Sequence, residues 1–175
     1  MARNALISII CADRKGLVAD IAGHLFDMEI NLGDTTFAVL GEVAEFTCIV
    51  DVPDRLSLKQ IERDLGSIPD LENARVLVTS FDLGPVHGRS GHITHRIELA
   101  GLDRPGVIAR LSEMFGQFGA NIVRMNSERI PGEGHERYVT RFAVFIPERR
   151  ADACLAAVAN TAGELRMSFR YETAG

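Results

Sequence analysis

The chain has 175 residues, a formal net charge of −5 and a pI near 5.5. This length suits one medium domain or two small domains of about 85 residues each, and the hydrophobic share of 46% is typical of a soluble globular protein. The acidic balance argues against direct binding of nucleic acid, which needs a basic patch. The apolar run before Asp13 is too short for a signal peptide or a membrane span, so we expect a cytoplasmic protein without membrane contact.

The first half of the chain predicts the order strand, helix, strand, strand, helix, strand. Apolar residues are continuous, then recur with a helical period, then alternate with polar residues. A Gly41-Glu42 turn joins the second and third strands, and Ser57 with Gln60 forms a capping box at the second helix. The predicted elements are strand 6–11, a helix from Leu17, strand 35–40, strand 46–52, a helix from Leu58 and a strand ending near Phe81.

Residues 83–92 contain Gly84-Pro85 and show no periodicity, so we interpret them as a linker between domains 1–82 and 93–175. The same order of elements then repeats. We expect Pro105 in the first turn of the third helix and Gly119 at its C-terminal cap. The predicted elements are strand 96–100, helix 107–118, strands 122–130 and 138–146 around a hairpin loop at 131–135, helix 151–162 closed by Gly163, and a last strand with Leu165, Met167, Phe169 and Tyr171 inward.

A βαββαβ order is the ferredoxin-like arrangement, an α+β fold. The right-handed crossover rule places both helices on one face of a four-stranded antiparallel sheet. Each half is therefore expected to form one such domain. We assign Ile7 and Ile49 to the opposite face, and their apolar character indicates that this face packs against another sheet or subunit.

A motif repeats at an offset of ninety residues. Asp13-Arg14-Lys15-Gly16-Leu17-Val18-Ala19 reappears as Asp103-Arg104-Pro105-Gly106-Val107-Ile108-Ala109. An asparagine follows each glycine by fifteen residues, as Asn31 and then Asn121. Repetition of polar residues and glycines in one register indicates two copies of a structural unit.

The repeated residues also suit a ligand with two opposite charges. The first N–H groups of a helix lack internal partners and attract a carboxylate, and a glycine lets the ligand come close. A nearby Asp can receive an amine, and Asn could bridge the two groups because its amide both donates and accepts. In the purely structural alternative, Asp is an N-cap, Gly forms the turn, and Asn simply tolerates the left-handed conformation. Their retention in both copies favours a binding function.

The Asp-Arg-Pro-Gly-Val-Ile motif followed by Gly-Ala-Asn-Ile resembles the signature of the ACT domain, a ferredoxin-like regulatory module. The resemblance covers nearly the whole chain as two tandem domains, and it is most similar to the glycine cleavage system transcriptional repressor family. The first copy also resembles the ACT domain of formyltetrahydrofolate deformylases, whose catalytic domain is absent. The resemblance implies two ligand sites between a strand–helix turn and a neighbouring domain, formed by Asp13, Gly16, Leu17 and Asn31 and by Asp103, Gly106, Val107 and Asn121.

The first of these two sites departs from the family pattern. Lys15 replaces the proline, and Glu29 replaces the glycine that follows the helix. A non-glycine residue in a left-handed conformation costs about 1 kcal/mol. If only one site works, we expect it to be the second.

The resemblance implies a non-catalytic regulator that binds a small amino acid, such as glycine, and acts through a protein partner such as a transcription regulator. It also favours a homodimer. A ligand-free assembly module is the alternative function. We predict no enzyme, because no nucleophile, base or pair of carboxylates can be assembled.

No cofactor or metal is expected either. His92 and His95 would point to opposite faces of an extended segment, so we interpret them as exposed linker residues. The cysteines, Cys11, Cys48 and Cys154, form no CxxC motif. We interpret them as buried free thiols.

Overall fold

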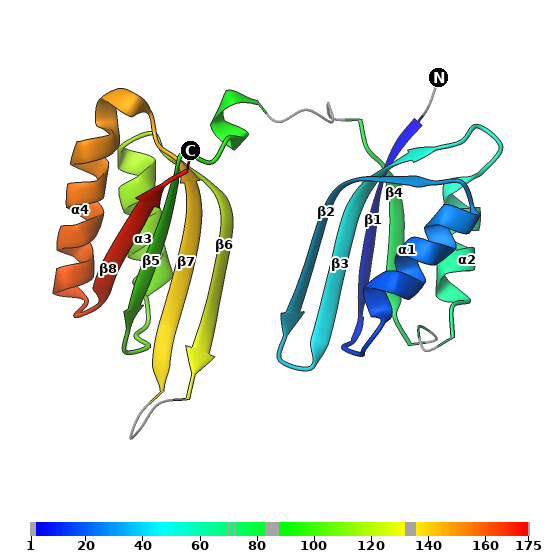
Figure 1. Cartoon of the computed structure of the whole chain (residues 1–175), viewed down its shortest axis with the longest axis horizontal. Helices are drawn as coiled ribbons and strands as arrows, with labels where there is room; N and C mark the ends of the chain where they lie inside the picture. The colour runs from blue at the N-terminus through cyan, green and yellow to red at the C-terminus, as the bar shows by residue number, and fades with distance from the viewer. Residues whose placement is uncertain (1–2, 70, 72, 83–87, 132–135, 175) are drawn as a thin grey trace. The chain divides into compact units, whose positions relative to one another are not determined.

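The computed structural model describes residues 3–69, 71, 73–82, 88–131 and 136–174. The chain divides into two compact units, Met1–Pro85 and Val86–Gly175. Each unit is a four-stranded antiparallel sheet with two helices (Figure 1). The predicted ferredoxin-like fold is therefore confirmed in both halves.

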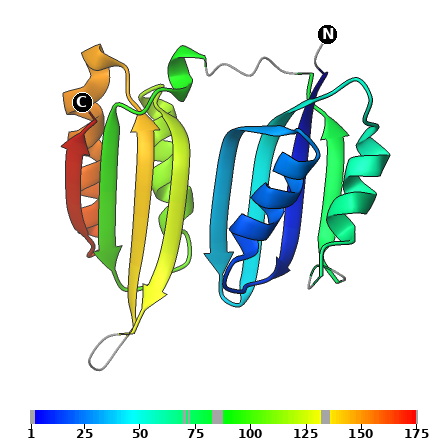
Figure 2. The same cartoon turned by 45° about the vertical axis from the view of Figure 1, so that its right-hand side comes forward.

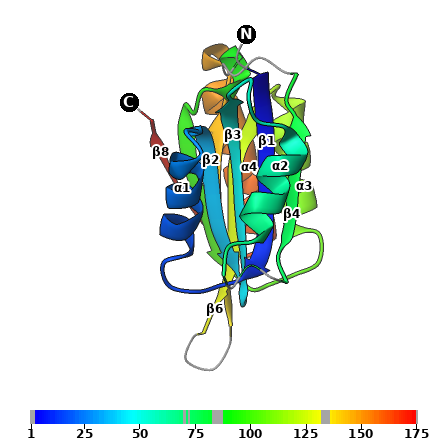
Figure 3. The same cartoon turned by 90° about the vertical axis from the view of Figure 1, so that its right-hand side faces the viewer.

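The first unit has the strand order β2-β3-β1-β4. Strands β1 and β3 are central, and β2 and β4 are the edges. Figures 2 and 3 show both helices on the same face of this sheet. Its elements are β1 (Arg3–Ala12), α1 (Leu17–Asp27), β2 (Asn31–Leu40), β3 (Val43–Val52), α2 (Leu58–Gly66) and β4 (Arg75–Ser80).

The second unit repeats this topology as β6-β7-β5-β8. Short 3₁₀ turns precede β5 and α4. Its elements are η1 (Arg89–Gly91), β5 (His95–Gly101), α3 (Val107–Gln117), β6 (Asn121–Ile130), β7 (Arg137–Phe145), η2 (Glu148–Arg150), α4 (Ala151–Glu164) and β8 (Ser168–Thr173).

Alternate strand residues build each core. In the first unit, the odd-numbered residues of β1 and the even-numbered residues of β3 lie beneath the helices, and Ile21 and Leu25 of α1 pack on them. Ile7 belongs to this core and is fully buried, so its assignment to the opposite face is wrong. Ile49 does lie on the helix-free face, because it pairs with Leu6 and not with a core residue.

The burial of the three free cysteines agrees with the sequence prediction at two positions and differs at one. Cys48 and Cys154 are buried as predicted, whereas Cys11 is only half-buried. Burial raises the pKa of the Cys48 thiol to about 12. Cys48 is therefore protonated and unreactive near neutral pH.

The left-handed residues that follow α1 and α3 agree with the sequence prediction. Glu29 has φ 59°, as its position opposite Gly119 in the repeat implies, and Gly119 has φ 68°. Arg55 stabilises this end of α1, because its guanidinium lies 2.7 Å from the Glu29 carboxylate and donates to the Met28 carbonyl at 3.2 Å. The left-handed residue after α1 is thus held by an ion pair where the second unit has glycine.

The fourth helix ends later than predicted. Gly163 lies within α4 and does not close it. The left-handed residue is Arg166, with φ 56°, and the N–H of Met167 donates to the carbonyl of Ala162 at 2.8 Å. This backbone bond closes the helix in a geometry that glycine usually provides.

Two further predictions differ from the structure, and a third holds only in part. Pro105 precedes α3, whose N-cap is Gly106, so the proline lies in the turn and not in the first helical turn. Tyr171 lies on the core face as predicted, because it pairs with Ile97, but its side chain is 53% exposed. His95 is buried at the start of β5, where its Nδ1 lies 2.9 Å from Thr94 Oγ1, so it is not an exposed linker histidine.

The predicted linker and one predicted hairpin lie partly outside the described residues, at 83–87 and 132–135. Of the remaining linker, Arg89–Gly91 forms η1. Among the described residues, no helix is long and apolar enough to cross a membrane.

Replacing Gly106 by alanine should lower the free energy of unfolding by about 1 kcal/mol. A Cβ at Gly106 would meet nothing within 4 Å, so the cost comes only from its φ of 88°. Gly116 is the matched control, because it lies inside the same helix with equally open surroundings. Gly116→Ala should raise stability by up to about 1 kcal/mol through helix propensity. Urea denaturation of both variants tests this, and equal effects would contradict it.

Candidate functional site

The two strand–helix turns have the same backbone. Gly16 and Gly106 are the N-caps of α1 and α3, with φ of 83° and 88°. The Asp residues lie three positions earlier and cap neither helix, so the interpretation of Asp as an N-cap is wrong. Each turn therefore exposes helix N–H groups beside an open glycine, with an Asp close by in the chain.

The hydrophobic residues predicted at these sites face the core. Leu17 and Val107 begin α1 and α3, and both side chains are 2% exposed. They can therefore offer a ligand only their backbone, and the N–H of Val107 already donates to the Arg104 carbonyl at 3.4 Å. Their side chains anchor the start of each helix to the sheet.

The two Asp residues differ in their surroundings. Asp103 Oδ2 accepts a hydrogen bond from Arg129 Nε at 2.9 Å, and it lies 2.7 Å from Arg129 Nη2 in an ion pair. The Asp103 carboxylate raises the pKa of Arg129 through this hydrogen bond. In the first unit, Val39 occupies the position of Arg129, and the Asp13 side chain is exposed to solvent.

The sequence analysis did not identify Arg129 as a site residue. The same offset of ninety residues that relates the two motifs also aligns Arg129 with Val39. This change from apolar to cationic was the available signal. Its meaning depended on the register of β6, which places the guanidinium against Asp103.

The two Asn residues lie far from the turns of their own units. Asn31 starts β2 after α1, and an eleven-residue helix is about 16 Å long. The strand register agrees: Asn31 and Asn4 both pair with Asp51, at the end of the sheet opposite to Ala12. The prediction that this Asn bridges the amine and the carboxylate of a ligand bound at the turn of its own unit is therefore wrong.

Asn121 has the corresponding place in the second unit. It starts β6 at the end of the sheet opposite to Asp103, and its Nδ2 donates to the Ser90 carbonyl at 2.8 Å. This bond ties η1 to β6. The structure thus brings Asp103, Gly106 and Val107 together at one end and separates Asn121 from them.

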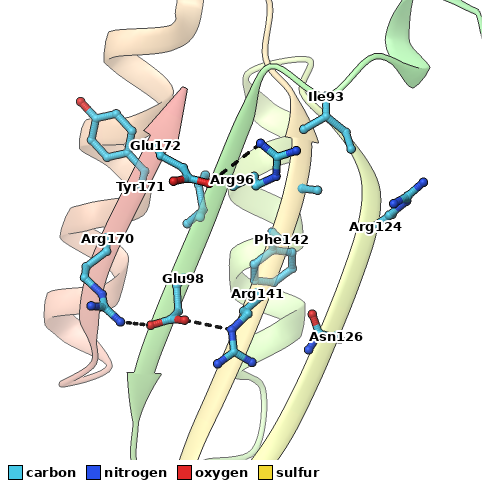
Figure 4. A pocket seen from close by; sticks show the side chains of 12 residues that line it. Ile93, Arg96, Glu98, Arg124, Asn126, Arg141, Phe142, Arg170, Tyr171 and Glu172 are labelled. Carbon is cyan, nitrogen blue, oxygen red and sulfur yellow. Dashed lines mark hydrogen bonds and ion pairs between the residues drawn. The ribbon is translucent and has the colours of Figure 1, made fainter. Parts of the chain in front are cut away.

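A hollow of about 590 Å³ lies elsewhere, on the helix-free face of the second unit. Figure 4 shows Arg and Glu side chains from all four strands around it. Glu98 occupies the centre, where it accepts from Arg170 and from Arg141 Nε, the latter at 2.9 Å. Arg141 also pairs with Glu128, and Arg96 lies 3.9 Å from Glu172.

In this network each Glu98 oxygen accepts from one Arg, and both Arg partners are held by the Glu98 carboxylate. The charges at the centre of the hollow are therefore paired with one another. None of the residues predicted to bind the amino acid lines it. Among the described residues, no group of three or more His, Cys, Asp or Glu side chains could hold a metal ion.

The Glu98 network should make stability depend on pH. Hydrogen bonding from Arg170, followed by that from Arg141, lowers the pKa of Glu98 from its ordinary value of 4.5. Since the folded pKa is the lower one, the stabilisation is present above pH 4.5 and is lost as the pH falls through the folded pKa.

Glu98→Gln should therefore lower the free energy of unfolding at pH 7 by less than about 1 kcal/mol, because the network is partly exposed. The difference between wild type and variant should vanish at low pH. Urea denaturation from pH 7 to pH 3 measures it, with Glu164→Gln on the surface of α4 as the control. An unchanged difference at pH 3 would count against the ion-pair interpretation.

Comparisons with known proteins agree with this architecture. Residues 95–153 match the ACT domain family. Over the full length of both chains, the structure is similar to that of an unknown protein from Galdieria sulphuraria, with 19% identity and a TM-score of 0.79.

A second solved structure is that of a protein proposed to be a glycine cleavage system transcriptional repressor. It shares 10% identity and a TM-score of 0.70 over 99% of this chain and 98% of that chain. These two likenesses establish the fold. A search of curated proteins found no match.

Proposed function

We propose that the chain is a tandem ACT-domain protein, a non-catalytic regulator that binds a small amino acid and acts by contacting another protein. One observation carries this proposal. The same open glycine turn begins a helix in both units, beside an Asp three residues earlier. A turn that exposes helix N–H groups next to a carboxylate suits the two charged groups of a free amino acid.

We propose that each complete site uses two different ACT units. The Asp and the glycine turn of one unit receive the amine and the carboxylate. The Asn comes from another unit, because Asp13 and Asn31 lie at opposite ends of the same unit.

The turn at Asp103 is the better candidate for zwitterion binding. Arg129 offers a cation for the ligand carboxylate, while Asp103 can receive the amine beside it. Val39 provides no such cation in the first unit. Binding then exchanges one ion pair within the protein for two with the ligand.

A ligand held between two units favours the relative orientation in which both can contact it. It shifts the population of orientations only as far as its affinities for them differ. A protein partner that recognises one orientation would respond to the amino acid. The structural likeness to a proposed glycine cleavage repressor supports glycine as the ligand and a transcription regulator as the partner.

The second candidate function is an assembly module without a ligand. Two observations favour it: Asp103 is already paired with Arg129, and Asn121 already donates to Ser90. In that case the turns only connect strands to helices. The units would then present surfaces to other chains without responding to an amino acid.

Calorimetry of the full chain with glycine and the other common amino acids distinguishes the two functions. We expect saturable binding of at least one small amino acid. Asp103→Ala and Asn121→Ala should each weaken it at least tenfold, which is about 1.4 kcal/mol. Asp13→Ala and Asn31→Ala should have smaller effects. Absence of binding by every amino acid, with the protein folded, would support the assembly module.

Arg129→Ala should also weaken the binding about tenfold or more, because the ligand carboxylate loses a charged partner. Arg149→Ala is the matched control, since Arg149 is an exposed arginine in η2. If Arg129 only competes with the ligand for Asp103, its removal would strengthen binding. Titration of both variants with the same amino acid decides between these roles.

A further inference from the structure

The helix-free faces of the two sheets have opposite chemistry. In the second unit this face carries the Arg and Glu network around Glu98. In the first unit the corresponding rows are mostly apolar or neutral. By register, Leu6 lies between Ile49 and Thr79, and Ser8 lies between Thr47 and Leu77.

Several of the apolar side chains on this first face meet water. Ile10 is 39% exposed, Leu77 is 47% exposed, and Leu40 and Val43 continue the face toward the β2–β3 turn. A contiguous exposed apolar surface of this kind typically marks a site of protein contact. Ser8 and Thr47 also lie on this face. Their hydroxyls satisfy one another, because the Thr47 hydroxyl donates to Ser8 Oγ at 3.4 Å, so they add little polarity to the apolar surface.

The charges beside this surface indicate what covers it. Ile10 pairs with Glu45 on one side and with Arg75 on the other. The row across the sheet therefore places one negative and one positive charge on opposite sides of β1. Neither side chain has an ion-pair partner among the residues that the structure describes.

The positions of Glu45 and Arg75 allow the face of one copy to pair with the same face of a second copy. A two-fold axis parallel to β1 exchanges its two sides, so Glu45 of one copy faces Arg75 of the other, and the second pair forms by symmetry. An axis across the strands would instead place Glu45 on Glu45. Sheets packed with strands nearly aligned lie about 10 Å apart, a distance that Glu and Arg side chains can bridge together.

We propose that the helix-free face of the first unit binds the same face of a second copy of this chain. The two-fold axis runs along β1. Leu6, Ile10 and Leu77 form the apolar centre, and two Glu45–Arg75 ion pairs flank it. This proposal concerns the dimer surface and does not depend on amino-acid binding.

Sedimentation velocity of the full chain over a concentration series tests it. The wild type should form a dimer. Glu45→Arg and Arg75→Glu should each raise the dissociation constant at least tenfold, because each places like charges opposite one another twice. The double variant Glu45→Arg with Arg75→Glu should recover most of the wild-type affinity, since the pairs reform with exchanged signs.

Glu164→Arg is the control for charge reversal, because Glu164 is exposed at the end of α4 in the other unit. It should leave the dissociation constant unchanged. Leu77→Glu should also weaken the dimer at least tenfold, and circular dichroism verifies that each variant is folded. A monomeric wild type, or a dimer that resists both Leu77→Glu and Glu45→Arg, would overturn the proposal. Failure of the double variant to recover would equally overturn the axis along β1.

Discussion

Burial of each sheet on one face only is the constraint on which the rest of this structure depends. Strand residues alternate between faces, so a pair of helices on one side commits every second residue to the core. Ile7, Ile9 and Phe46 meet this requirement in the first unit, and Ile97, Leu99 and Phe142 meet it in the second. Residues on the other face can then differ between the two units, because they do not pack in the core.

The helix-free faces of the two units differ in their side chains. The second unit spreads Arg and Glu side chains across its open face and pairs them with one another, which keeps the surface hydrated. The first unit leaves Leu77 exposed, and it leaves Ile10 exposed between Glu45 and Arg75. Duplication followed by divergence outside the core thus yields one open face covered by paired charges and one that leaves apolar side chains exposed.

The strand–helix turns show the opposite behaviour. Their backbone is the same in both units, since only glycine adopts φ near 85° without strain, and no neighbouring atom compels a particular shape. What differs is the charge beside the turn. Arg129 neutralises Asp103, whereas Val39 leaves Asp13 to solvent, so two identical turns need not have identical affinities for a ligand.

The sequence by itself determined the duplication, the βαββαβ order and the conformation of the turns, because each depends on residues close together in the chain. Alternation identifies strands, a period of 3.6 identifies helices, and Glu29 could be recognised as a strained residue from its place opposite Gly119. Only the tertiary structure decided which of these residues meet. The strand register sends Asp103 and Asn121 to opposite ends of one sheet and brings Arg129 to Asp103. It also moves Ile7 into the core while leaving Ile10 outside. Pairing between distant strands sets these relations, and local patterns do not encode the register of such pairing when both faces carry apolar residues.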